Sequence, residues 1–258
     1  MLKPNEIAKS FVQAGMSKTS LPVTKMFVLG IFAGAFVAFA GAGSTIASCT
    51  IANPSLAKLV NALIFPAGLI MVILAGSELF TGNSLIILSV LEKKVTMKEM
   101  FKNWMVVYAG NLVGSLCIAF LIVQARIPDL FSEQLAQTMI NTASAKTQIV
   151  FLQAIVKGIL CNMLVCISVW VATSSKQVPG KILALYLPIA VFVLCGFEHS
   201  VANMYCIPAG IFTSLEYGMT ATGLNLMGLF HNLIPVTIGN VIGGLLIGIG
   251  YHYVYLKK

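Results

Sequence analysis

Six long apolar segments occupy most of this 258-residue chain. A transmembrane helix needs about 20 consecutive, mostly apolar residues, and every one of the six segments has that length. Only 9% of the residues are charged, whereas a soluble domain usually carries about 25%. The chain is therefore predicted to be an all-α integral membrane protein with six transmembrane helices. The expected spans are residues 26–47, 59–91, 101–124, 147–173, 182–212 and 226–255.

The basic residues between the spans predict the orientation of the chain, because cytoplasmic segments carry an excess of Lys and Arg. With the amino terminus inside, twelve of the sixteen basic residues are cytoplasmic and three are outside, namely Lys58, Arg126 and Lys146. Lys157 lies within span 4, and its role stays open. Both termini are predicted to be cytoplasmic, and the net charge of +8 is assigned to loops and not to nucleic-acid binding. The twelve are Lys3, Lys9, Lys18, Lys25, Lys93, Lys94, Lys98, Lys102, Lys176, Lys181, Lys257 and Lys258.

Two polar motifs of the first half recur in the second half. The pattern Asn-x-x-x-Val-x-x-Gly-Asn-x-x-Gly begins at Asn103 in span 3 and at Asn232 in span 6. The pattern Gly-x-Glu-x-x-x-x-Asn begins at Gly76 in span 2 and at Gly196 in span 5. Since each half has three spans, the second half enters the membrane from the opposite face. Inverted repeats of this kind occur in transporters and channels, with the site near the midplane.

The repeat divides the chain into four predicted parts. Residues 1–25 form a cytoplasmic amphipathic segment, and residues 26–124 form the first inverted repeat. Residues 125–146 connect the halves outside the membrane, with a short interfacial helix within 127–145. Residues 147–258 form the second repeat. Glycine pairs four residues apart, such as Gly30 and Gly34, favour close helix packing, either within one chain or between copies.

Glu78 and Glu198 are the only acidic residues within the six spans. A charged side chain at the centre of a membrane helix costs about 2.5–3.5 kcal/mol on insertion scales and usually faces the interior of the bundle. Glycine and short polar residues follow both glutamates, so spans 2 and 5 are predicted to be broken. Two broken helices would direct backbone amides and helix amino termini inward, which suits an anion. Alternatively, the glutamates only tie the breaks together by hydrogen bonds.

His199 is the sharpest single candidate for a functional residue. It lies in the predicted break of span 5, where it could hydrogen-bond or protonate a permeating species. The alternative is a structural histidine held by Glu198 or by a backbone carbonyl. Lys146, at the outer mouth of span 4, is placed to attract an anion, although a lysine there could also be an interface anchor.

Large apolar side chains flank both predicted breaks. Leu79 and Phe80 lie in the first half, Phe192 precedes His199 in the second, and Phe65 lies earlier in span 2. They could pack the core, or they could form apolar constrictions that exclude hydrated ions. Their spacing does not separate these alternatives.

Several other function classes lack their sequence signals. An enzyme would need a nucleophile with a base or a spaced Cys/His set, and the chain has no H-E-x-x-H or G-x-S-x-G motif. The six cysteines lie in apolar runs and are assigned to packing, so no metal or cofactor is predicted. A water or glycerol channel stays the alternative within the transport class, although only Asn53-Pro54-Ser55 approaches the expected Asn-Pro-Ala boxes. A purely structural scaffold would not explain polar breaks at the midplane.

Three sequence runs give the chain a family resemblance. The runs Glu78–Asn83, Gly158–Cys166 and Gly196–Met204 resemble the formate/nitrite transporter family, and the run E-H-S-x-A-N-M is highly specific. The resemblance covers all six spans and looks closest to the clostridial hydrosulfide-channel branch. It implies a homopentamer in a bacterial cell membrane, an aquaporin-like protomer fold and one anion pore per protomer. Hydrosulfide, formate and nitrite are the implied cargo class, with channel and proton-coupled carrier both open.

The resemblance also implies roles for individual residues. Leu79, Phe80 and Phe192 look like constriction residues, with Phe65 nearby. Thr81 looks like part of the loop that interrupts span 2. His199 looks like the central pore histidine, with Glu198, Asn162 and Asn203 as its polar surroundings. Lys146 looks like the vestibule lysine.

Overall fold

The computed structural model describes residues 1–257, and within them the secondary structure is entirely helical. Lys258, one of the twelve basic residues assigned to the cytoplasm, lies outside the described residues. The elements are α1 (Pro4–Thr19), α2 (Val23–Ser48), α3 (Pro54–Ile64), α4 (Ala67–Ala75), the 3₁₀ helix η1 (Gly82–Ile86), α5 (Ile87–Leu91), α6 (Met97–Gln124), the 3₁₀ helix η2 (Ile127–Asp129), α7 (Gln134–Thr147), α8 (Phe151–Thr173), α9 (Val178–Leu194), α10 (Ser200–Tyr217) and α11 (Leu226–Tyr255).

Five helical segments of the described chain are long and apolar enough to cross a membrane. They are α2, residues Pro54–Ala75 formed by α3 and α4, α6, α8 and α11. The predicted spans 2 and 5 are each divided between separate helices. Residues 76–81 separate α4 from η1, and residues 195–199 separate α9 from α10.

Two element boundaries differ from the sequence expectation. The helix of span 2 begins at Pro54 and not near residue 59, because the Asn53 side chain accepts a hydrogen bond from the Leu56 N–H (3.1 Å) and caps the helix. In the connecting segment, α7 has 14 residues and ends at Thr147. Lys146 therefore lies in the last turn of α7, before α8 begins at Phe151.

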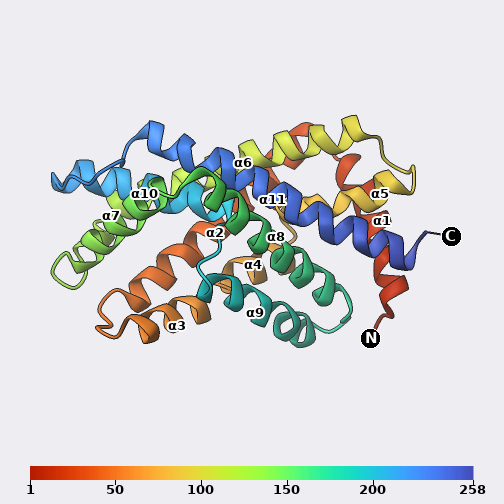
Figure 1. Ribbon diagram of the computed structural model, residues 1–258, viewed down its shortest axis with the longest axis horizontal. Helices are drawn as coiled ribbons and strands as arrows, with labels where there is room; N and C mark the ends of the chain where they lie inside the picture. Colours follow the sequence, from red (N-terminus) through yellow and green to blue (C-terminus); the bar gives the residue numbers. More distant parts are fainter. Residues whose placement is uncertain (258) are drawn as a thin grey trace.

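Both described chain ends lie at one end of the elongated molecule, beside α1 and α5 (Figure 1). The opposite end is formed by α7 with the loop before it and by the carboxyl end of α10 (Figure 1). The amphipathic helix α1 lies against the bundle: Ile7 and Gly15 are buried, and the Phe11 ring stacks on Trp170 with 5.3 Å between centroids. The two ends of the molecule thus carry different elements, α1 at one and α7 at the other.

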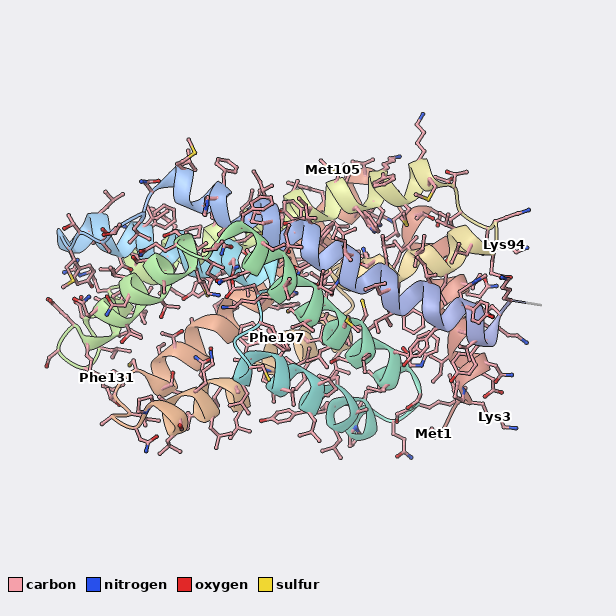
Figure 2. The ribbon with its side chains drawn as sticks, in the orientation of Figure 1. Met1, Lys3, Lys94, Met105, Phe131 and Phe197 are labelled. Atoms are coloured by element: carbon pink, nitrogen blue, oxygen red, sulfur yellow. The ribbon has the colours of Figure 1, made fainter. Side chains whose placement is uncertain are left out.

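The perimeter of the bundle exposes large apolar side chains. Met105 on α6 is 70% exposed and points away from the protein (Figure 2), and Leu183 and Met227 are exposed to a similar degree. Hydrophobic side chains on this scale are costly in water and are expected where a helix faces lipid.

Two helix pairs, α2 with α6 and α8 with α11, approach each other closely at glycines. A Cβ atom on Gly34 of α2 would lie 2.1 Å from the Asn111 carbonyl oxygen of α6. In the second half, a Cβ on Gly243 of α11 would lie 2.2 Å from the Ile159 carbonyl oxygen of α8. These glycines therefore serve packing within one chain, which settles a question that their spacing left open.

Candidate functional site

The two helix breaks begin at corresponding glycines. Gly76 follows α4 with φ +77°, and Gly196 follows α9 with φ +69°. This left-handed conformation is unfavourable for residues with a Cβ atom and lets each helix end there, before the buried residues of the break. The following residues need other partners for their backbone groups, because the interior offers little water.

Asn111 of α6 supplies those partners in the first half. Its amide nitrogen donates to the carbonyl oxygens of Glu78 (2.9 Å) and Gly30 (2.8 Å), and its Oδ1 accepts from the Phe80 N–H (3.0 Å). One fully buried side chain thus holds the break against both α2 and α6.

Asn240 of α11 does the same in the second half. Its amide nitrogen donates to the carbonyl oxygens of Glu198 (2.9 Å) and Gly158 (2.8 Å), and its Oδ1 accepts from the Ser200 N–H (2.8 Å). The recurring Gly-Asn motif of the sequence therefore corresponds to an equivalent set of contacts in the two halves.

The Glu78 carboxylate forms an ion pair with Lys18 of α1. Lys18 Nζ donates to Glu78 Oε1 (2.8 Å) and to Asn83 Oδ1 (3.0 Å). Asn83 Nδ2 donates to Glu78 Oε2 (2.7 Å) and to Asn103 Oδ1 (2.9 Å), and Asn103 Nδ2 donates back to the Lys18 carbonyl (3.3 Å). A closed polar cluster thus joins α1, the first break and α6.

The Glu198 carboxylate forms the corresponding ion pair with Lys146 of α7. Lys146 Nζ donates to both carboxylate oxygens (3.0 and 2.9 Å). Asn203 Nδ2 donates to Glu198 Oε2 (2.6 Å) and Asn232 Oδ1 (2.7 Å), and Asn232 Nδ2 donates to the Lys146 carbonyl (2.9 Å). Here Asn203 Oδ1 is buried without a protein partner, whereas its counterpart in the first half accepts from a lysine.

Thr81 and His199 join the two breaks. The Thr81 side-chain oxygen lies 2.8 Å from His199 Nε2, and both residues are almost completely buried. His199 is also the amino-terminal cap of α10, where its Nδ1 accepts from the Ala202 N–H (3.1 Å). That bond assigns the neutral tautomer with the proton on Nε2, so His199 donates to Thr81. The Thr81 hydroxyl hydrogen then remains free for another acceptor.

Asn162 of α8 holds the first break from the opposite side. Its amide nitrogen donates to the Thr81 carbonyl (3.2 Å), the Ser84 hydroxyl (3.3 Å) and the Asn240 carbonyl (2.6 Å). Thr81 is therefore fixed through its backbone by Asn162 and contacted at its side chain by His199. Glu198 does not bond the His199 ring, in contrast to one alternative raised from the sequence.

Two cavities approach this contact from the two ends of the molecule. The Lys146 cavity, of about 460 Å³, contains Lys146, Glu198, His199 and Asn203 in its wall and lies toward α7. The Lys18 cavity, of about 270 Å³, is lined by Lys18, Glu78 and Asn83 among others and lies under α1. The two walls share no residue, so the buried centre separates the cavities.

The large apolar residues of the breaks occupy different surroundings. Phe65 and Phe192 line the Lys146 cavity and pack edge to face, and the Phe192 ring stacks 6.0 Å from the His199 ring. Leu79 lines the Lys18 cavity. Phe80 lines neither cavity, because its ring packs against Trp104 and Tyr108 of α6.

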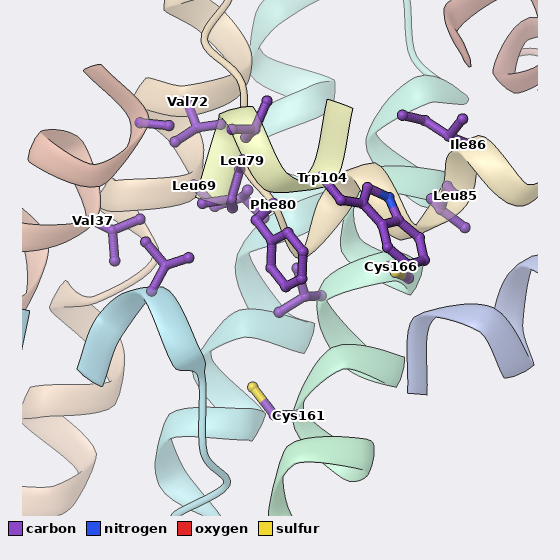
Figure 3. Close-up of a cluster of buried hydrophobic side chains, with 14 of the residues drawn as sticks. Val37, Leu69, Val72, Leu79, Phe80, Leu85, Ile86, Trp104, Cys161 and Cys166 are labelled. Atoms are coloured by element: carbon purple, nitrogen blue, oxygen red, sulfur yellow. The ribbon is translucent and has the colours of Figure 1, made fainter. Parts of the chain in front are cut away.

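Figure 3 shows this arrangement in the buried cluster: Leu79 lies with Leu69 and Val72, and the Phe80 ring lies beside Trp104. Leu69 and Val72 line the same cavity as Leu79. The structure therefore brings Leu79, Phe65 and Phe192 to cavity walls, whereas the Phe80 ring is buried against α6.

Lys18 is a site residue that sequence reasoning missed. The distribution of basic residues predicts only that Lys18 lies on the cytoplasmic side. A signal was present: Lys18 and Lys146 each lie five positions before the first residue of the following long helix, Val23 or Phe151. The repeat therefore extends beyond the apolar spans in which its motifs were recognised.

A helical bundle that exposes large apolar side chains on its flanks and has a buried polar centre between two cavities is the architecture of a multi-pass membrane channel or transporter. The comparisons with known proteins agree with this class. Residues 5–255 match the family model described as "Formate/nitrite transporter". The chain belongs to the formate/nitrite transporter family.

Known relatives cover nearly the whole chain. It is 38% identical to "Formate channel FocA" of Escherichia coli K12, over 100% of this chain and 96% of that protein. It is also 38% identical to "Uncharacterized transporter YrhG" of Bacillus subtilis, over 99% and 94%. These names give no support to the alternative of a water or glycerol channel, and they describe transport proteins and not enzymes.

Solved structures share the fold. A chain described as "FNT family ion channel" superposes with a TM-score of 0.87 at 30% identity, covering 96% of this chain and 98% of the other. A chain described as "Pentameric formate channel with formate bound" gives a TM-score of 0.81 at 35% identity, covering 91% and 98%.

Proposed function

We propose that this protein carries small monovalent anions of the hydrosulfide, formate and nitrite class across a bacterial cell membrane. The observation that carries the proposal is the pair of cavities that approach the buried Thr81–His199 contact from opposite ends. The relatives named as formate channels support the cargo class. The likeness to a pentameric channel supports a homopentamer with one pore per protomer.

The proposed architecture has six spans in two inverted three-helix repeats, residues 26–124 and 147–258, with spans 2 and 5 broken. The equivalent contacts of Asn111 and Asn240 support the inversion. Both termini are proposed to be cytoplasmic, so the Lys146 cavity faces outward and the Lys18 cavity faces inward. Reporter fusions at each terminus test this orientation.

In the proposed pathway, an anion is attracted into the Lys146 cavity and passes Phe65 and Phe192. At the centre, the Thr81 hydroxyl donates to the anion while His199 donates to Thr81. The amino terminus of α10 adds its partial positive charge at this point. Leu79 is the apolar barrier on the other side, and crossing it is less costly for an anion that has transiently acquired a proton. Proton exchange near His199 makes the flux pH-sensitive in this scheme.

Flux measurements in proteoliposomes test the proposal. The wild-type protein should conduct labelled formate, nitrite and hydrosulfide, with a flux that depends on pH. His199→Phe should abolish that pH dependence, and Lys146→Ala should lower the flux of all three anions. Lys25→Ala, which removes an exposed lysine outside both cavities, serves as the control. The scheme is wrong if both site variants keep wild-type flux and pH dependence.

A further inference from the structure

The two cavities differ in formal charge. The Lys146 cavity is lined by two lysines, Lys58 and Lys146, and by one carboxylate, Glu198. The Lys18 cavity is lined by one lysine, Lys18, and one carboxylate, Glu78. The remaining ionisable residues in the wall of the Lys146 cavity are His199, in its neutral tautomer, and the thiols Cys49 and Cys206. One cavity therefore has an excess positive charge, and the other is balanced.

The excess charge belongs to Lys58 of α3. Both carboxylate oxygens of Glu198 are already bonded by Lys146, and one of them also accepts from Asn203. Lys58 takes part in none of the ion pairs formed among residues 1–257. Lys146 is therefore committed to a partner, whereas the Lys58 ammonium is available.

Lys58 is also directed at the break. Its Nζ lies 3.9 Å from the position that a Cβ atom on Gly196 would occupy. Its charged neighbours are Lys146, Glu198 and Lys157. The ammonium group therefore sits beside the start of the break that leads to His199, and not at a remote edge of the cavity.

Within the described residues, 147–257, the second repeat has no equivalent of this feature at the other cavity. Lys181 lies near the start of α9 as Lys58 lies near the start of α3, yet Lys181 lines neither cavity. The extra cation is thus a departure from the symmetry of the two halves.

We propose that Lys58 is the residue that concentrates anions in the Lys146 cavity, while Lys146 positions Glu198 and the second break. The proposal rests on the anion transport proposed above and names the residue that serves it. An unpaired cation in the wall of a cavity with low-dielectric surroundings raises the local concentration of anions. Salt on that side of the membrane screens the attraction, because the Debye length falls from about 30 Å at 0.01 M to about 10 Å at 0.1 M.

The salt dependence of anion permeability reveals the side of the membrane on which Lys58 acts. At low anion concentration a passive pore has the same permeability in both directions, so a preference for one direction of flux is not expected. Instead, salt should lower permeability only when it is added on the side of the Lys146 cavity. A bulky impermeant salt such as potassium gluconate separates screening from competition.

The experiment measures initial uptake of labelled formate into right-side-out and inverted membrane vesicles that contain the full-length protein. External ionic strength is raised from about 0.01 to 0.2 M at constant osmolarity, a range in which steering by charge is progressively screened. Wild-type uptake into right-side-out vesicles should fall several-fold, and Lys58→Gln should start lower and lose most of that dependence. Lys58→Arg should restore it, and Lys181→Gln should behave as wild type.

Each outcome bears on a separate claim. Equal salt dependence of wild type and Lys58→Gln in both vesicle types would overturn the role of Lys58. An effect of Lys58→Gln confined to inverted vesicles would support that role and reverse the proposed orientation. Absence of any wild-type anion uptake would instead contradict the proposed function itself.

Discussion

The polar clusters at the two breaks have the same composition, but their lysines bond to different partners. In the first half, Lys18 divides its bonds between the Glu78 carboxylate and the Asn83 amide oxygen. In the second half, Lys146 gives both bonds to Glu198, and Asn203 Oδ1 is left without a protein donor. The lysines are also unequally covered, with side-chain exposures of 31% and 19%. The repeat therefore conserves the scaffold of the breaks while the cavities on either side diverge.

The scaffold part of this comparison predicts the largest effects. Asn111→Leu and Asn240→Leu should each leave one carbonyl group, that of Glu78 or Glu198, and one N–H, that of Phe80 or Ser200, without a partner inside the bundle. The carbonyl groups of Gly30 and Gly158 keep their bonds within α2 and α8. Each buried unsatisfied group costs about 1–3 kcal/mol, so each variant should lose about 2–6 kcal/mol of stability. Thermal unfolding of the detergent-solubilised protein measures this loss. Similar losses support equivalent roles, and a much smaller loss in one variant would show that the halves are not equivalent at this position.

The ion pairs predict effects in the same range, and unequal ones. Breaking a buried pair costs about 3–5 kcal/mol when one charge remains without a partner. Lys146→Met should approach this range because Lys146 and Glu198 are both well covered, whereas Lys18→Met should cost less. Adding Glu198→Gln to Lys146→Met should recover part of the loss. An equal cost for the two lysine variants would contradict the difference in burial.

The contact between the halves predicts a smaller effect on stability and a distinct effect on flux. Thr81→Val removes the hydroxyl that accepts from His199, and a hydrogen bond of this kind contributes about 1 kcal/mol. Formate flux should fall because the hydroxyl that donates to the anion in the proposed pathway is lost, while Thr81→Ser should retain most of the flux. Loss of flux in both variants would point to packing around Thr81 and away from its hydroxyl.

Substitutions of Leu79 and Phe80, the two adjacent apolar residues of the first break, should have the smallest effects. Leu79 lines the Lys18 cavity, so Leu79→Ala should raise anion flux a few-fold at little cost to selectivity against larger solutes. Phe80 packs on Trp104 and Tyr108, so Phe80→Leu should lower stability by about 1 kcal/mol and leave flux nearly unchanged. An increase of flux in Phe80→Leu would assign the barrier to both residues.

The sequence predicted the polar scaffold better than the identity of the lysine partners. Glu78, Asn83 and Asn111 are recognisable because polar residues are rare in apolar spans and recur in the second half. Lys18 is hidden because it lies in an amphipathic segment where lysines are common, and only the folded chain brings α1 over the first break.

Phe80 shows a second limit of sequence reasoning. Adjacent apolar residues in a non-helical segment point in different directions, so Leu79 and Phe80 are indistinguishable by pattern and separate only in the structure. The boundary of α7 was also beyond prediction from hydropathy, since this helix is polar on one side and owes its position to packing on α10.

The contacts of Asn111 and Asn240 bear on how the chain enters a membrane during synthesis. Each break depends on an asparagine from the last long helix of its own half, α6 for residues 78–80 and α11 for residues 198–200. Until that helix arrives, the carbonyl group of Glu78 or Glu198 and the N–H of Phe80 or Ser200 lack their asparagine partner in the hydrocarbon. The first half can therefore complete the Asn111 bonds of its break before the ribosome has made the second half, whereas Thr81 and Ser84 must wait for His199 or Asn162.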